Sequence, residues 1–143
     1  MPAKDIYHNA VKNTLIKEGW TITADPYLIK YEDAGLYADL AAEKPIAAER
    51  QGQKIIVEIK SFVGRSLMYD FHAALGQYIV YRNLIQLTAP EYTLYLAIDD
   101  VVYKEFFQRK GVKPDFYNRS KTSKTNPSAH SRKLAYQYRS EIW

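Results

Sequence analysis

The order of apolar and polar residues predicts a helix followed by short strands in the first third of the chain. Residues 5–18 place their apolar side chains on one stripe and end at a glycine, a pattern typical of a helix. Residues 20–24 and 27–31 alternate between apolar and polar side chains, which favours strands. A further strand is expected over residues 36–42, and the proline in residues 43–45 ends it.

A hairpin is predicted next, with strands over residues 46–50 and 54–61 joined by a turn at residues 51–53. Side chains alternate between the two faces of a strand, so the second strand divides into an apolar and a charged face. The apolar face carries Ile55, Val57 and Ile59. Glu58 and Lys60 share the opposite face, so a stiff element holds an acid and a base side by side.

A long helix is expected over residues 67–87, with apolar positions suited to packing on a sheet. These positions are Phe71, Ala74, Leu75, Tyr78, Ile79 and Leu84. Residues 93–98 predict an apolar strand, and Asp99 is well placed to cap a helix over residues 101–107. The order of helix, strands, long helix, strand and helix predicts an α/β (α+β) fold, a mixed sheet flanked by helices.

Charge divides the chain into an expected domain, residues 1–109, and a basic polar tail, residues 110–143. The tail has eight Lys and Arg against two Asp and Glu, so the net charge of +4 arises there. Few large aliphatic residues follow residue 110, and we expect a loose arm. Basic residues near tyrosines can grip a nucleic acid strand or can simply be solvated. The candidate nucleic-acid-binding residues are Lys121, Lys124, Arg132 and Lys133.

Composition narrows the classes of site that the chain can hold. The 143 residues, 47% of them hydrophobic, favour one globular domain. The absence of cysteine excludes disulfides, thiolate zinc sites and thiol nucleophiles. The histidines His8, His72 and His130 are too far apart for a zinc site, and His72 is expected to be partly buried. Because no apolar stretch approaches the roughly 18 residues of a membrane helix, we expect a cytoplasmic protein without a membrane partner.

Asp39, Glu58 and Lys60 are the candidate catalytic residues, with Asp39 and Glu58 as metal ligands. Two carboxylates can place hard oxygen ligands on one Mg²⁺, the only cofactor that we expect. The lysine would then orient an attacking water and stabilise charge on phosphorus. A solvated strand face is the alternative interpretation of Glu58 and Lys60. Glu49 and Glu18 compete with Asp39 for the place of the second acid.

Gln77 is a fourth candidate residue, on the long predicted helix. Its amide is suited to hydrogen-bond a metal-bound water or the DNA backbone, or it lies at the edge of the contact between helix and sheet. Tyr81 follows one helical turn later and is expected in the core.

Six short segments, in order and with matching spacing, resemble the XisH family of fdxN element excision controlling factors. They are residues 1–8, 19–23, 57–62, 74–78, 94–98 and 106–109. The family is similar in fold to the restriction endonuclease-like, PD-(D/E)xK group. That wider resemblance implies that the nuclease-like motif falls on Asp39, Glu58 and Lys60, and that Gln77 and Tyr81 match its Gln-xxx-Tyr pattern.

The resemblance implies an accessory role in developmental DNA rearrangement. XisH proteins look like factors that work on DNA with a site-specific recombinase and a small partner, XisI, during heterocyst differentiation in cyanobacteria. We therefore expect a factor that controls site-specific excision of a DNA element, with an active Mg²⁺-dependent endonuclease as the alternative. A homodimer is also open, since small nuclease-like folds often pair across a sheet edge or helix.

The tail departs from the family pattern after Arg109, where relatives usually continue with apolar, strand-like segments. Two interpretations remain open. The tail is read in a shifted frame, or it is a genuine arm for DNA or a partner.

Overall fold

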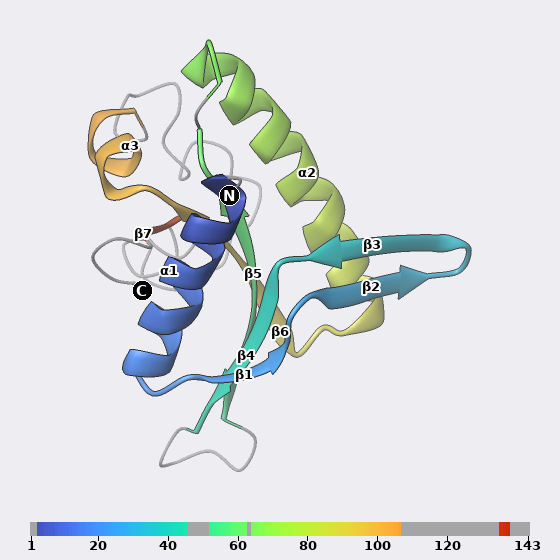
Figure 1. Ribbon diagram of the computed structural model, residues 1–143. Helices are drawn as coiled ribbons and strands as arrows, with labels where there is room; N and C mark the ends of the chain where they lie inside the picture. The colour runs from blue at the N-terminus through green and yellow to red at the C-terminus, as the bar shows by residue number, and fades with distance from the viewer. Residues whose placement is uncertain (1–2, 46–51, 63, 107–134, 138–143) are drawn as a thin grey trace, which may run out of the picture.

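The computed structural model describes residues 3–45, 52–62, 64–106 and 135–137, in which a run of strands lies between the first two helices (Figure 1). The elements are α1 (Ala3–Lys17), β1 (Thr21–Ala24), β2 (Tyr27–Tyr31), β3 (Ala34–Ala38), β4 (Leu40–Lys44), β5 (Gln53–Lys60), α2 (Leu67–Thr88), β6 (Tyr92–Ile98), α3 (Asp100–Glu105) and β7 (Ala135–Gln137). Every helix and nearly every strand expected within the described residues is present. The expectation of a mixed sheet flanked by helices is confirmed.

The main sheet has the strand order β1-β4-β5-β6-β7. β4 runs antiparallel to both β1 and β5, whereas β5, β6 and β7 run parallel to one another. A second sheet holds only β2 and β3, which project from the body as a hairpin beneath α2 (Figure 1). β5 is therefore a central strand, with Leu40 opposite Val57 on one side and Leu96 opposite Glu58 on the other.

The two faces of the main sheet are covered by different helices (Figure 1). On the face of α1, Ile55 and Val57 are fully buried against Val11 and Leu15, and Ile59 packs at the edge of this cluster. That outcome confirms the apolar face predicted for β5. On the face of α2, buried residues from the sheet and the helix pack together, namely Ile56, Leu94, Tyr81 and Ile85. Glu58 and Lys60 share the parity of Ile56 along the strand and so face α2.

The strand expected over residues 36–42 is wrong as one element, because it divides at Asp39 into strands of two different sheets. The backbone N–H of Asp39 donates to a side chain instead of a neighbouring strand, and local bonds of this kind interrupt a ladder. The hairpin prediction is corrected too. β5 pairs with residues 40–44 and not with the strand expected at residues 46–50, which lies outside the described residues.

α2 confirms the predicted long helix, with one error in its buried positions. Ser66 caps its first turn, where the hydroxyl accepts a hydrogen bond from the Tyr69 N–H at 3.2 Å. Phe71 and Ala74 are buried as expected, but Ile79 is 38% exposed. The helical period of 3.6 residues turns Tyr81 and Ile85 toward the sheet in its place, which confirms the expected core position of Tyr81.

The C-terminal part of the described chain holds one confirmed cap and one correction. Asp99 caps α3 by accepting the N–H of Val101 at 2.7 Å, as predicted. The expected loose arm contains a short strand, β7, which pairs with β6. Lys121, Lys124, Arg132 and Lys133 lie outside the described residues. Among the helices that the structure describes, none combines the length and the apolar composition of a membrane span.

Candidate functional site

Asp39 and Glu58 lie together because of the register of β4 on β5. Asp39 occupies the bend immediately before β4, and Leu40 is paired with Val57 across an antiparallel ladder. The two strands of such a ladder run in opposite directions, so the residue before Leu40 lies opposite the residue after Val57. The proline that follows β4 does not separate the two acids, because it lies at the other end of that strand.

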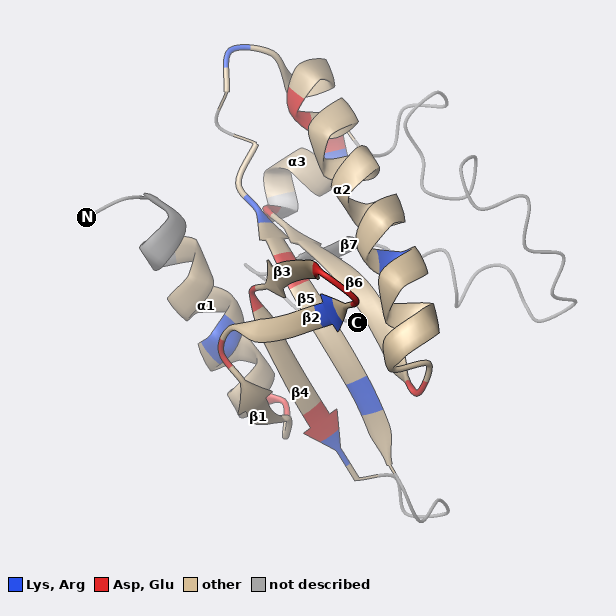
Figure 2. Ribbon diagram, turned by 90° about the vertical axis from the view of Figure 1, so that its right-hand side faces the viewer, with Lys and Arg blue, Asp and Glu red and all other residues tan. Residues whose placement is uncertain are grey.

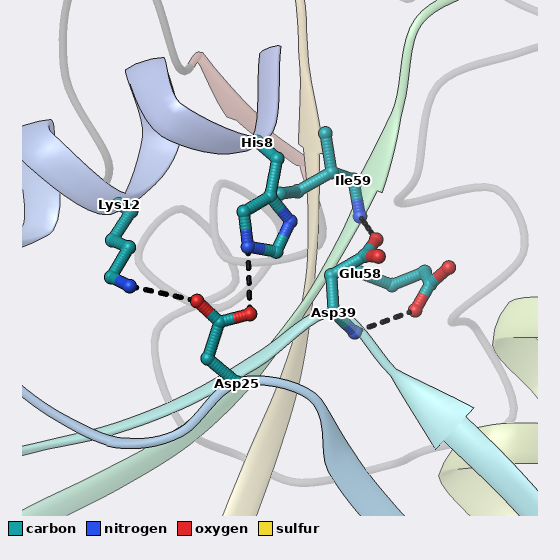
Figure 3. Close-up of polar contacts among 6 residues, drawn as sticks. All are labelled: His8, Lys12, Asp25, Asp39, Glu58 and Ile59. Carbon is teal, nitrogen blue, oxygen red and sulfur yellow. Dashed lines mark hydrogen bonds and ion pairs between the residues drawn. The ribbon is translucent and has the colours of Figure 1, made fainter. Parts of the chain in front are cut away.

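Two reciprocal hydrogen bonds hold the carboxylates in place (Figure 3). The Asp39 N–H donates to Glu58 Oε2 at 3.2 Å, and the Ile59 N–H donates to Asp39 Oδ2 at 2.7 Å. Glu58 therefore accepts the N–H of Asp39 itself, and Asp39 accepts the N–H of the residue that follows Glu58, which fixes both side chains relative to the two strands. A carboxylate oriented by backbone donors loses little freedom when it takes up a further ligand.

Glu58 is an acid in a buried position, with only 8% of its surface exposed. Burial and the nearby charge of Asp39 raise the pKa of Glu58 to about 8, although Lys60 opposes the shift. Its carboxyl group is therefore largely neutral near pH 7. A buried acid next to a second acid is a common condition in functional sites, because an added cation relieves both the burial and the repulsion.

Lys60 extends the cluster toward solvent. Its Nζ lies 3.7 Å from Glu58 Oε1, and 29% of its side chain is exposed. It also lines a pocket of about 370 Å³ between the end of β5 and the first turns of α2, formed with Ser61, Phe62, Gly64, Asp70, Ala73 and Ala74. The lysine thus joins the buried acids to a space that an external group can enter.

The residues present fit a hard divalent cation with a small set of protein ligands. Asp39 and Glu58 are the acids that would hold Mg²⁺, and no group of three or more acidic or histidine ligands occurs among the described residues. Mg²⁺ usually binds through one or two carboxylates and completes its shell with waters and substrate phosphates. The raised pKa of Glu58 agrees with this fit, because a bound cation would offset the burial and the charge of Asp39 that raise it.

Gln77 is connected to the segment before Asp39 through a chain of hydrogen bonds. Its Nε2 donates to the Tyr81 hydroxyl at 2.9 Å, and that hydroxyl donates to the Tyr37 carbonyl at 3.1 Å. Tyr37 lies two residues before Asp39 in the chain. Gln77 and Tyr81 therefore tie α2 to β3, the strand that ends immediately before Asp39, and the amide donor of Gln77 is directed at Tyr81.

A second charged cluster was not found from the sequence. His8 Nε2 and Lys12 Nζ each lie 2.8 Å from a different oxygen of Asp25 (Figure 3). Burial raises the pKa of the Asp25 carboxyl, but the hydrogen bonds and charges of Lys12 and His8 outweigh it and hold that pKa below its usual range. The only signal in the sequence was the spacing of His8 and Lys12, which puts both on one face of a helix.

The remaining sequence candidates lie elsewhere. Glu18 follows α1 and precedes Gly19, where an added Cβ would lie 3.7 Å from the Lys44 side chain. That places Glu18 near the far end of β4 from Asp39, so it does not serve as the second acid. Glu49 lies outside the described residues. His72 is exposed on α2, which corrects the expectation that it is partly buried.

Comparison with known proteins identifies relatives over most of the chain. The model of the XisH protein family matches residues 1–121. The crystal structure of an XisH family protein from Nostoc punctiforme is 36% identical, with a TM-score of 0.73 over 97% of each chain. That of a fdxN element excision controlling factor protein from Anabaena variabilis is 35% identical, with a TM-score of 0.73 over 97% of this chain and 96% of that one.

The family match extends beyond Arg109, the residue at which the resemblance was expected to end. No curated protein matches the chain. The family model covers most of the sequence, and both solved relatives share more than a third of their residues with it over nearly their whole length. The chain belongs to the XisH family.

Proposed function

We propose that this protein controls the site-specific excision of a DNA element, the role that the name of the Anabaena variabilis relative describes. The observation that carries the proposal is the 35% identity to that factor across nearly the full length of both chains. The role implies DNA as the target and a site-specific recombinase with a small XisI-like protein as partners. Heterocyst differentiation in a cyanobacterium is the setting that we propose.

Removal of the gene tests this role directly. In a host that carries the element, PCR across the rejoined DNA ends measures how much of the element has been excised. Deletion should change the yield of the rejoined product, and the wild-type gene supplied in trans should restore it. An unchanged yield and timing of excision in the deletion strain would contradict the proposal.

A Mg²⁺-dependent endonuclease is the second candidate function, favoured by the convergence of Asp39, Glu58 and Lys60. Asp39 and Glu58 would hold the cation, which would polarise a phosphate oxygen and lower the pKa of a water when bound. Because burial and Asp39 keep Glu58 protonated near pH 7, the residue must release a proton as it becomes a ligand. Lys60, partly exposed beside Glu58, would stabilise negative charge on the phosphate.

Metal titration and DNA cleavage separate the two candidates. We would titrate Mn²⁺ and Mg²⁺ by calorimetry into the wild-type protein, into Asp39→Asn and into the control Asp25→Asn, which alters the other cluster. The same proteins would be incubated with supercoiled DNA and either ion. An endonuclease should bind the ion, should nick the DNA, and should lose both properties in Asp39→Asn but not in Asp25→Asn.

Lys60 provides the test of chemistry as distinct from metal binding. Lys60→Ala should keep most of the metal affinity and lose nicking by about a hundredfold or more, whereas Lys30→Ala, at an exposed lysine of β2, should behave as wild type. Nicking that survives in Lys60→Ala would reject the proposed role of this residue. Metal binding without nicking would leave the controlling role and reject the endonuclease.

A further inference from the structure

α2 is an unusual surface helix, because none of its exposed residues is Asp, Glu, Lys or Arg. Among its 22 residues the acidic and strongly basic ones are Asp70 and Arg82, both half-buried, and His72 is exposed. Most of the α2 ribbon is therefore coloured as uncharged (Figure 2). Surface helices normally place charged residues on the side opposite the core, and helices that are apolar all round are covered. Tyr69 is 74% exposed, Leu87 is 65% exposed and Val80 is 50% exposed.

The exposed residues of α2 follow the spacing of a helix pairing seam. The residues in question, here called the α2 seam, are Tyr69, Ala73, Gly76, Val80, Asn83 and Leu87, and all are exposed. Their intervals alternate between four and three residues throughout, which is the spacing of the contact positions in coiled coils. This seam lies directly opposite the buried residues Phe71, Ala74, Tyr81 and Ile85. A single polar residue, Asn83, interrupts the seam, and such a residue can fix the register of a helix pair.

Gly76 is a second and independent indication that another helix covers the seam. Glycine is among the least favourable residues in the middle of a helix. Its backbone here does not have a positive φ, and a Cβ added to it would meet nothing within 4 Å. The described structure therefore gives no steric reason for glycine at this position. A helix that approaches closely from outside would give one, since the separation of packed helices depends on the side chains at the contact.

We propose that the occupant of the α2 seam is the same helix of a second copy of this chain. The two helices pack antiparallel, and the two-fold axis crosses them at the level of position 78. In this register Val80 of each copy lies over Gly76 of the other, Tyr69 lies against Leu87, and Ala73 lies against Asn83. In the middle of the contact a larger side chain thus meets a smaller one, the two large side chains Tyr69 and Leu87 meet at its ends, and no Asp, Glu, Lys or Arg is buried. A two-fold interface must be complementary to itself, and the α2 seam has this property.

The homodimer does not require either candidate function. Glu58 and Lys60 face the inner side of α2, whereas the seam faces outward and meets the pocket beside Lys60 at Ala73. Dimerisation would place two sites in one particle with a two-fold relation. That arrangement matches a DNA target with two-fold symmetry.

The oligomeric state of the purified full-length chain is the first test. Sedimentation equilibrium from low to high micromolar concentration should show a reversible dimer. Val80→Glu should raise the dimer dissociation constant by at least about tenfold, because it places a charge in the centre of the contact. Val101→Glu is the matched control, since Val101 is a 44% exposed valine on α3 and its substitution should leave the dimer intact.

Gly76→Ala should change the stability of the monomer and the affinity of the dimer in opposite directions, which a purely structural role of Gly76 would not produce. Alanine should raise the thermal stability of the dilute, monomeric chain through its higher helix propensity. It should also weaken the dimer, because the added methyl group meets Val80 of the second copy. A monomer at every concentration, or a dimer that Val80→Glu does not weaken, would overturn the proposal.

The register can be read by cross-linking, because the chain has no cysteine of its own. A mixture of Ala73→Cys and Asn83→Cys chains should form a disulfide between the two variants under mild oxidation, since the paired positions come close enough for a bridge. Ala73→Cys alone should form far less. Efficient self-cross-linking of Ala73→Cys, without the mixed product, would indicate a parallel pair and reject the antiparallel arrangement.

Discussion

The structure holds two clusters of ionisable side chains in opposite electrostatic conditions. In the exposed cluster, Asp25 has two basic partners at 2.8 Å, and its pKa lies below the usual range. In the buried cluster, Glu58 lies beside a second acid and has one lysine at 3.7 Å, and its pKa is raised to about 8. The first cluster is balanced by its own residues.

The difference teaches where a ligand is needed. The exposed cluster ties α1 to the segment before β2, and a structural role accounts for all three of its side chains. The buried cluster keeps a proton on an acid that would lose it in water, so the fold itself does not supply the missing positive charge. Strongly perturbed acids in partly enclosed positions are candidates for function for this reason.

The largest expected effect is that of pH on Glu58. The folded-state pKa of about 8 lies above the ordinary value of 4.5, so the folded chain keeps a proton that the unfolded chain releases. The free energy of unfolding should therefore fall as the pH rises from about 5 to about 8, by an amount on the order of a few kcal/mol. Glu58→Gln should remove this dependence and should be more stable than wild type at pH 8.

Urea unfolding at a series of pH values measures this effect. Glu43→Gln is the control, because Glu43 is a partly exposed acid on the neighbouring strand that pairs with Lys54. A parallel course of the wild-type and Glu58→Gln curves between pH 5 and pH 8 would contradict the buried, protonated state of Glu58.

The next effect is stabilisation by a divalent cation. An ion that binds the folded chain alone should raise its stability by about 2.7 kcal/mol at a hundred times its dissociation constant. The gain should be larger at pH 8.5 than at pH 6, because protons compete with the ion for Glu58. Thermal unfolding with and without Mn²⁺ measures it, and removal of the ion with a chelator should reverse it. Equal gains in wild type and Asp39→Asn would show that the ion binds elsewhere.

Tyr81→Phe should have a smaller effect on the support of the buried cluster. The substitution removes the hydroxyl that joins Gln77 to the Tyr37 carbonyl, at a cost of about 1 kcal/mol in unfolding free energy. If the hydrogen bonds also position Asp39, the affinity for Mn²⁺ should fall as well. Tyr31→Phe, at an exposed tyrosine of β2, is the control for urea unfolding and for titration. If neither measurement changed in Tyr81→Phe, the Tyr81 hydroxyl would have no role beyond the packing of its ring in the core.

The smallest effect is expected in the exposed cluster. Asp25→Ala should lower stability by less than about 1 kcal/mol, since the partners are solvated and salt screens them. Because the folded-state pKa of Asp25 is lowered, its contribution is present above the ordinary pKa and is lost as the pH falls through the folded-state value. Unfolding in low and high salt measures this effect. If Asp25→Ala lost as much unfolding free energy as the wild type loses through Glu58 between pH 5 and pH 8, the contrast between the two clusters would be wrong.

Local pattern was sufficient for much of the fold. The two-residue period of β5, the helical stripe of α1 and the cap at Asp99 depend on neighbours in the sequence, and each was predicted correctly. The choice of Asp39, Glu58 and Lys60 also followed from the sequence, through residue type and the face of a strand. The error at Ile79 arose because an apolar residue on a helix does not reveal which side the sheet covers.

The approach of Asp39 to Glu58 depended on tertiary structure, because nineteen positions separate them and only the register of β4 on β5 closes that distance. The same is true of the bend that sends β3 and β4 into different sheets, and of the meeting of His8, Lys12 and Asp25. The sequence alone determined which residue types stand on which strand or helix face, since the geometry of each element is local. Burial and proximity were decided by packing, because desolvation and charge interactions depend on residues that are distant along the chain.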